Sequence, residues 1–153
     1  MSLRALWFFM WFLCLPLAQA EPPDSWQFKE WTQAVAQVND EKKPFFVLFG
    51  YTDCPWCEYL YRRGMNDTEV RAKYKQNFVV TYVDTKSHRA DEIFVLPGGA
   101  TITHGDLIRR FQAYPTPSWI FLSPSGSVLH SNRNGKTTSR EMLRDVDLAL
   151  GKL

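Results

Sequence analysis

Apolar residues fall into short blocks along the chain, and the spacing within each block predicts a helix or a strand. Residues 26–39 carry apolar side chains at helical spacing, so we expect a helix there. The continuous apolar run Phe45–Phe49 is typical of a strand that is buried on both faces. A helix is then expected from Cys54 to about Arg63, and a strand over Phe78–Val83, which is rich in valine and aromatic residues.

The remaining blocks complete an alternation of helices and strands. They predict a short helix that Asn66 or Asp67 caps and that runs through Tyr74. They also predict a helix over 106–112, strands over 118–122 and 128–131, and a helix over 138–150. Residues 85–103 break the pattern with mixed charge and Pro97-Gly98-Gly99, so we interpret them as an insertion or long loop with room for a small hairpin. The order joins a parallel half to an antiparallel hairpin half. We therefore predict an α/β fold with a central mixed sheet flanked by helices.

The first 20 residues differ in pattern from the rest of the chain. Arg4 precedes an almost wholly apolar stretch, residues 5–15, and the segment ends in the small-x-small pattern Ala18-Gln19-Ala20. This order is typical of a signal peptide, so we expect cleavage after Ala20 and an exported domain over 21–153. A membrane anchor is the alternative, but the apolar run is shorter than the roughly 20 residues that span a bilayer.

Charge and cysteine content narrow the choice of function. The chain has 18 basic and 16 acidic residues, without a basic stripe or a long run of like charge that would favour nucleic acid or a lipid surface. Cys14 lies in the predicted leader, so the mature domain keeps only Cys54 and Cys57. A disulfide between such close positions closes a tiny loop and stabilises a fold poorly. The pair is therefore interpreted as a working disulfide.

Cys54-Pro55-Trp56-Cys57 stands where the predicted strand ends and the next helix begins. A thiol at the first turn of a helix faces unpaired backbone N–H groups and the positive end of the helix dipole, which stabilise its thiolate. We expect Cys54 to be the exposed nucleophile, and Cys57, one helical turn later, to be the buried cysteine that resolves a mixed disulfide. Pro55 suits the first helical turn. Trp56 adds an apolar surface to which a partner can dock.

Metal binding is the rival use of this cysteine pair. The two thiols would supply two ligands, and zinc would need two more, from His88, His104 or His130. None of these histidines belongs to a second paired motif, and each is better interpreted as a surface or loop residue. We therefore predict no metal site and no cofactor, while a copper or zinc carrier stays an alternative.

The order of elements and the place of the cysteine pair resemble the thioredoxin fold, over about residues 26–150. A second signature is Tyr114-Pro115-Thr116-Pro117, which precedes an apolar strand as the Thr-Pro or Ile-Pro segment does in that family. By this match Pro117 is the cis-proline, and Thr116 offers its backbone to an extended substrate segment. The resemblance also implies that 85–103 is an insertion after the second central strand.

Within the family, the chain most resembles exported bacterial thioredoxins of the sulfur-oxidation-cluster (SoxW) type. It shares their opening, Lys43-Pro44 followed by an apolar strand, a glycine and Cys-Pro-x-Cys. It departs from ordinary thioredoxins, which have Gly-Pro between the cysteines and a buried Asp where this chain has Leu48. Proton transfer from the buried cysteine must then use another group or water. Glu58 is the nearest acidic candidate, although a solvated Glu is the better interpretation, and Asp53 suits a helix N-cap.

The resemblance implies a periplasmic thiol–disulfide oxidoreductase that exchanges disulfides with partner proteins as a monomer. Trp56 stands where the strong periplasmic oxidases have a His that stabilises the thiolate, which favours a reductase. A reductase in an oxidising compartment needs an electron donor, for which the resemblance suggests a membrane thiol transporter. Cytochrome maturation or sulfur metabolism proteins would lie downstream. A disulfide oxidant or isomerase, a metal carrier and a non-catalytic binding module remain alternatives.

Overall fold

The computed structural model describes residues 21–87, 89–133, 135 and 138–153. The predicted signal peptide, residues 1–20, and His88 lie outside the described residues. The central sheet has four strands in the order β2-β1-β5-β6, with β1 parallel to β2 and antiparallel to β5, and β5 antiparallel to β6. The strands are β1 (Phe45–Gly50), β2 (Val79–Asp84), β5 (Ser118–Leu122) and β6 (Val128–Asn132). The predicted mixed sheet is therefore confirmed.

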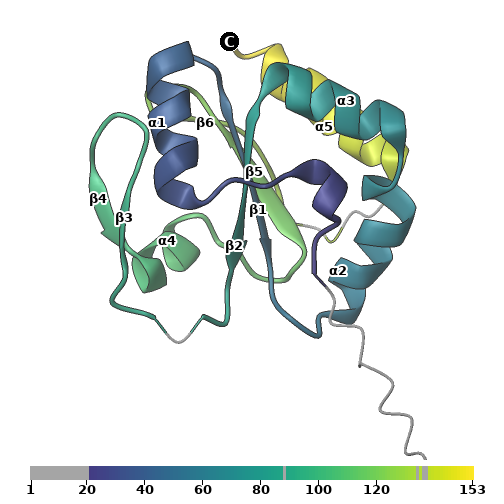
Figure 1. Cartoon of the computed structure of the whole chain (residues 1–153), viewed down its shortest axis with the longest axis horizontal. Helices are drawn as coiled ribbons and strands as arrows, with labels where there is room; N and C mark the ends of the chain where they lie inside the picture. Colours follow the sequence, from purple (N-terminus) through teal and green to yellow (C-terminus); the bar gives the residue numbers. More distant parts are fainter. Residues whose placement is uncertain (1–20, 88, 134, 136–137) are drawn as a thin grey trace, which may run out of the picture.

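Helices cover both faces of this sheet (Figure 1). On one face lie α1 (Trp31–Glu41), α4 (His104–Arg110) and a two-stranded hairpin of β3 (Ile93–Val95) and β4 (Thr101–Thr103). On the other lie α2 (Pro55–Leu60), the π-helical turn η2 (Tyr61–Met65), α3 (Thr68–Asn77) and α5 (Ser139–Leu150). Within the described part of the chain, no helix is long and apolar enough to cross a membrane.

Strand β1 separates two cores, because successive side chains along a strand point to opposite faces. Phe46 and Leu48 enter one core, and Phe45, Val47 and Phe49 enter the other. The first, here called the disulfide-side core, also holds Trp26, Cys54, Cys57, Leu60, Tyr61, Met65, Val70, Tyr74, Phe78, Trp119 and Phe121. The second, the opposite core, also holds Trp31, Val35, Val38, Phe94, Leu107, Ile108, Ile120 and Leu122. The expectation that this strand is buried on both faces is confirmed.

The prediction of one helix over 26–39 is wrong at its start. A short 3-10 turn, η1 (Asp24–Trp26), ends at Gln27, whose φ of 52° is left-handed, and α1 begins only at Trp31. Between them Lys29 forms an isolated parallel bridge to Thr81 of β2. The backbone groups of this segment therefore bond to the sheet edge and not to a helix. As a result the indoles of Trp26 and Trp31 enter opposite cores.

The helix that follows the cysteine pair runs further than predicted. After α2 it continues through the π-helical turn η2 to Met65, and not to about Arg63. The cap of α3 is Asp67, not Asn66, because its Oδ1 accepts hydrogen bonds from the backbone N–H groups of Glu69 at 2.9 Å and Val70 at 3.3 Å. Such a bond satisfies donors that have no partner within the helix.

The 85–103 insertion contains the expected hairpin, and its turn packs against the β5–β6 turn. Gly98 and Gly126 both have positive φ, 89° and 84°, which favours glycine. A Cβ on Gly98 would lie 2.8 Å from the carbonyl oxygen of Ser125, and a Cβ on Gly126 would collide with that of Pro97. The two turns therefore approach each other backbone to backbone.

Candidate active site

The cysteine pair forms a disulfide at the start of α2. Cys54 is the N-cap residue of the helix, Pro55 occupies its first position, and the Cα atoms of Cys54 and Cys57 are 5.2 Å apart. The backbone N–H of Cys57 donates a hydrogen bond to the Cys54 sulfur over 3.2 Å. The same donor can stabilise a thiolate on Cys54 once the disulfide is reduced, as expected for a thiol at a helix N-terminus.

The expectation that Cys54 is exposed is wrong for the disulfide form. Cys54 is 1% exposed and Cys57 is fully buried. Thr116, itself only 9% exposed, is one of the groups that cover the pair, since its hydroxyl lies 3.5 Å from the Cys54 sulfur. A disulfide sulfur carries no proton, so here the hydroxyl donates and the sulfur accepts.

The loop before β5 brings Thr116 to the cysteine pair, as the sequence predicts. The peptide bonds Tyr114–Pro115 and Thr116–Pro117 are both cis. Two side-chain hydrogen bonds fasten this loop to its surroundings: the Ser118 hydroxyl donates to the carbonyl oxygen of Ala113 at 2.9 Å, and the Tyr114 hydroxyl donates to that of Thr85 at 3.0 Å. Thr116 thus lies in contact with the Cys54 sulfur, although the two residues are 62 positions apart in the sequence.

Trp56 gives the site its exposed apolar surface. Its side chain follows Pro55 in the first turn of α2, and the residue is 67% exposed. Tyr114, on the loop that carries Thr116, is also largely exposed. The two aromatic residues thus come from the two segments that meet at the disulfide, and they are available to contact another protein.

The two acidic residues beside the pair take different places. Glu58 is half-exposed and pairs with Arg62 over 3.6 Å, which agrees with the interpretation as a solvated side chain. Asp53 is not the N-cap of α2, because that position belongs to Cys54. It lies in the preceding turn with a left-handed φ of 63°. The chain must reverse between β1 and α2 within a few residues, and Asp is among the residues that tolerate this conformation.

Leu48 is fully buried in the disulfide-side core, so this strand position places an aliphatic side chain there.

The sequence analysis missed a polar group near the cysteine pair, Tyr61. It follows Cys57 by four residues and therefore lies on the same face of the helix. That spacing was a usable signal. Burial raises the pKa of Tyr61 far above its usual value, and the nearby Tyr82 raises it further.

Two of the three histidines considered as metal ligands, His104 and His130, have other partners among the described residues. The His104 Nε2 lies 2.8 Å from the carbonyl oxygen of Asp84, and the His130 Nε2 lies 3.1 Å from Asp145 Oδ1. Across the described ranges, no group of three or more His, Cys, Asp or Glu residues could hold a metal ion. The geometry of the cysteine pair is that of a disulfide, which needs neither metal nor cofactor for exchange with a thiol.

Comparison with known proteins agrees with the fold. Residues 31–147 match the thioredoxin-like domain family, so the chain belongs to this family. A segment of 91 residues, 58% of the chain, is 29% identical to spermatogenesis-associated protein 20 of Rattus norvegicus. The chain spans only 11% of the length of that relative.

Solved structures show the same fold. A thioredoxin from Thermus thermophilus is 18% identical, with a TM-score of 0.63 and coverage of 80% of this chain and 85% of its own. The disulphide isomerase from Xylella fastidiosa Temecula1 is also 18% identical, with a TM-score of 0.54 and coverage of 91% and 97%. The chain therefore has a thioredoxin-like fold, and its cysteine pair forms a disulfide.

Proposed function

We propose that this protein is an exported thiol–disulfide oxidoreductase that reduces disulfides of partner proteins in the periplasm. The observation that carries the proposal is the Cys54–Cys57 disulfide at the start of α2, with the Thr116 hydroxyl and the Cys57 N–H both directed at the Cys54 sulfur. Two donors at one sulfur favour its thiolate, and the thiolate is the form that attacks a disulfide.

The reaction is written for the reduced protein. The Cys54 thiolate attacks one sulfur of the partner's disulfide, and the other partner sulfur leaves as a thiolate and takes up a proton. Cys57 then loses its proton and attacks the Cys54 sulfur, so the bond to the partner breaks and the second partner sulfur leaves. Two electrons pass from the cysteine pair to the partner, and the protein is left with the disulfide seen here.

The finer parts of the proposal concern recognition and location. Trp56 and the backbone of Thr116 contact the partner, and Pro117 shapes the loop that presents Thr116. The N-terminal 20 residues direct export and are removed after Ala20, which leaves a monomer of residues 21–153. A membrane thiol transporter supplies the electrons. Among the thioredoxin-like proteins we place the chain with the SoxW type, on the Lys43-Pro44 opening and the Cys-Pro-x-Cys motif.

A trapping experiment tests the exchange. In Cys57→Ala, Cys54 still attacks the partner, but the mixed disulfide cannot be resolved, so a covalent adduct should accumulate in the periplasmic fraction and disappear on treatment with dithiothreitol. The control is the double variant Cys54→Ser/Cys57→Ala, which should form none. Mass spectrometry of the adduct would name the partner. Equal adduct from both variants, or none from either, would refute disulfide exchange through Cys54.

The direction of electron flow needs a separate measurement, the equilibrium of the Cys54–Cys57 disulfide with glutathione. A reduction potential near that of thioredoxin, about −270 mV, supports a reductase. A potential near about −120 mV would identify a disulfide oxidant instead. Stoichiometric copper or zinc in the purified protein, lost in Cys54→Ser, would identify a metal carrier.

A further inference from the structure

The Tyr61 hydroxyl is a buried polar group that the proposed function does not yet use. Tyr61 is 5% exposed, and its hydroxyl makes no hydrogen bond of ordinary geometry among the described residues, although the hydroxyl of Tyr82 lies near enough to interact with it. A buried hydroxyl that lacks a well-aligned hydrogen-bond partner destabilises the fold, so we ask which group it could bond to during the reaction.

This hydroxyl lies close to the resolving cysteine. A Cβ added to Gly50, at the end of β1, would be 3.2 Å from the Tyr61 hydroxyl, 3.3 Å from the Cys57 sulfur and 3.0 Å from Cε2 of Tyr82. The hydroxyl and the sulfur therefore border the same small space in front of Gly50. An added Cβ would be crowded by all three atoms, so glycine at this position lets the hydroxyl and the sulfur approach each other.

The Cys57 sulfur requires a nearby hydrogen-bond donor to stabilise its thiolate. It is fully buried, and burial disfavours a thiolate because the charge leaves water. The backbone N–H of Cys57 donates to the Cys54 sulfur, so it does not stabilise a thiolate on Cys57. A hydrogen-bond donor directed at the buried sulfur would offset part of the loss of hydration.

We propose that, once the Cys54–Cys57 bond is broken, the Cys57 sulfur turns toward the Tyr61 hydroxyl, which borders the same face of Gly50, and accepts a hydrogen bond from it. This bond stabilises the Cys57 thiolate and so speeds the step that releases the partner. The inference rests on the proposed thiol–disulfide exchange, because it assigns a donor to the second half of that reaction.

Tyr61 acts as a donor and not as a base. Burial, and after it the neighbouring Tyr82 and Asp84, raises the pKa of Tyr61 far above its usual value, so the hydroxyl keeps its proton throughout. In the resolving step the Cys57 proton passes to water, and the thiolate attacks the Cys54 sulfur. A Cys54–Cys57 bond replaces the Cys54–partner bond, and the electron pair leaves with the partner sulfur. The titratable groups that face Tyr61 are Tyr82 and Asp84 of β2.

The test separates the two halves of exchange with a small disulfide, dithiobis(nitrobenzoate), as the probe. Reduced protein should release one coloured thiolate when Cys54 attacks, at a rate proportional to probe concentration. A second is released when Cys57 resolves the mixed disulfide, at a rate independent of probe concentration. The variant Tyr61→Phe removes only the hydroxyl. The matched control is Tyr59→Phe, which removes an exposed hydroxyl from the same helix.

Tyr61→Phe should leave the first phase unchanged and slow the second. A lost hydrogen bond to a charged group corresponds to a rise of roughly 1–2 units in the Cys57 pKa. A thiol of higher pKa is also a better nucleophile, so the second phase at neutral pH should slow roughly three- to tenfold. Its pH profile should move upward by the same pKa shift, which ¹³Cβ nuclear magnetic resonance of Cys57 can check.

Other outcomes are equally decisive. If Tyr61→Phe has the wild-type second phase and pH profile, the inference is wrong while the exchange reaction stands. If the wild-type protein releases no second thiolate, the proposed function fails with it. A tyrosine that acted only through the fold would change the melting temperature and both phases, whereas loss of a donor to the Cys57 thiolate should slow the second phase alone. A second variant, Gly50→Ala, places a methyl 3.2 Å from the hydroxyl and 3.3 Å from the sulfur and so hinders their approach; it should also slow only the second phase, and an unchanged rate would count against the inference.

Discussion

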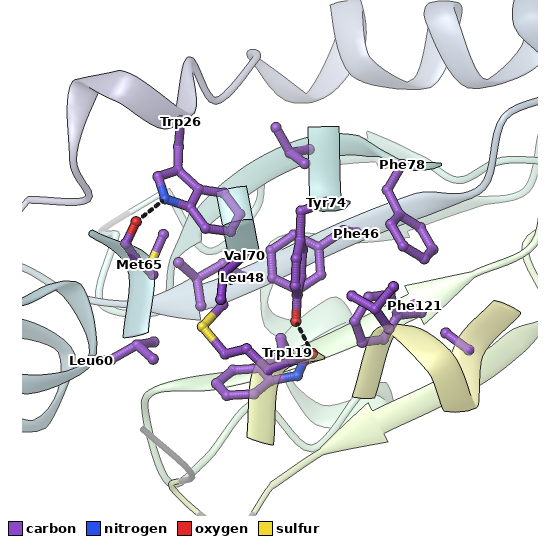
Figure 2. Packing of buried hydrophobic residues seen from close by; sticks show 14 of the residues in the cluster. Trp26, Phe46, Leu48, Leu60, Met65, Val70, Tyr74, Phe78, Trp119 and Phe121 are labelled. Carbon is purple, nitrogen blue, oxygen red and sulfur yellow. Dashed lines mark hydrogen bonds between the residues drawn. The ribbon is translucent and has the colours of Figure 1, made fainter. Parts of the chain in front are cut away.

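The two cores of this molecule are built differently, although they share one sheet. In the disulfide-side core, three buried aromatic residues other than Tyr61 carry polar atoms that donate hydrogen bonds to defined acceptors within that core. The Trp26 indole donates to the carbonyl oxygen of Met65 at 2.8 Å (Figure 2), the Tyr74 hydroxyl to that of Met142 at 3.1 Å, and the Trp119 indole to Asp145 Oδ2 at 3.1 Å.

The opposite core is mainly aliphatic and aromatic hydrocarbon, and it supports the inserted β3–β4 hairpin. Its indole, that of Trp31, donates to the carbonyl oxygen of Val95 in the hairpin at 2.7 Å. Buried hydrogen bonds have directional requirements that hydrocarbon packing lacks. The contrast lies in what the buried polar atoms hold: in the disulfide-side core they bind one part of the domain body to another, whereas the Trp31 indole attaches an added hairpin.

The largest effect is expected from Asp145→Ala, which breaks the polar packing of the disulfide-side core. Asp145 is fully buried, and its loss leaves the Trp119 indole without this acceptor and His130 without its 3.1 Å contact. We expect the free energy of unfolding of the oxidised protein to fall by about 1.5–3 kcal/mol, as for a hydrogen bond to a charged group. Urea denaturation measures it.

The control for that variant is Asp147→Ala on the same helix. Asp147 is exposed and pairs with Lys73 over 2.6 Å, so its removal should cost no more than about 1 kcal/mol. An equal fall in the free energy of unfolding for Asp145→Ala and Asp147→Ala would mean that the buried hydrogen bonds of Asp145 do not stabilise the disulfide-side core.

A smaller effect is expected from Trp31→Phe, which weakens the attachment of the hairpin. The ring still packs on Phe94, whose centroid lies 4.9 Å away, but the bond to Val95 is lost. The free energy of unfolding should fall by about 0.5–1.5 kcal/mol, and amide hydrogen exchange in the β3–β4 hairpin should accelerate. Trp26→Phe is the matched variant, with a similar loss but no change in hairpin exchange. Faster hairpin exchange in both variants would contradict a side-specific attachment.

The smallest effect is expected from Ile93→Lys. Ile93 lies in β3, where burial alternates and Phe94 alone of the three residues is buried; Ile93 is 61% exposed. The free energy of unfolding should change by no more than about 0.5 kcal/mol. Phe94→Lys would force a charge against Trp31 and should cost more than about 2 kcal/mol. Thermal melts of the Ile93→Lys and Phe94→Lys variants would show which of the two side chains faces the core. A larger loss of stability from Ile93→Lys would mean that Ile93, and not Phe94, is the buried residue.

Much of the fold was predictable because its signals are local. The apolar run Phe45–Phe49 indicated a strand buried on both faces, and the alternation of its side chains into two cores confirms it. Asp67 was one of two candidate caps for α3. The place of Trp26 was not predictable, because the segment after it bonds to β2: the Lys29 carbonyl oxygen accepts from the Thr81 hydroxyl, 52 residues away. Helical spacing alone could not exclude that pairing.

The candidate active site, like the fold, was predictable from the sequence only in its local features. The sequence motif places Cys54 at the start of a helix, which the structure confirms, but the N-cap is Cys54 itself and not Asp53. Its burial was predicted wrongly, because cover comes partly from Thr116 on a distant loop. The meeting of Tyr61 and Tyr82 around Gly50 depends on the parallel register of β1 and β2, in which Gly50 stands opposite Asp84. Residue spacing within one helix could suggest Tyr61 but not its neighbours across the sheet.

The contact between the two glycine turns has a consequence for how the chain can vary. The backbone at Gly98 lies against Ser125, and the backbone at Gly126 lies against Pro97. The turn of the inserted hairpin is therefore fixed to the β5–β6 turn, in addition to the chain connections at the two ends of the hairpin. An epitope tag or an extra residue spliced into either bend would have to push the other away. Length changes in the two loops are therefore tolerable only when they occur together.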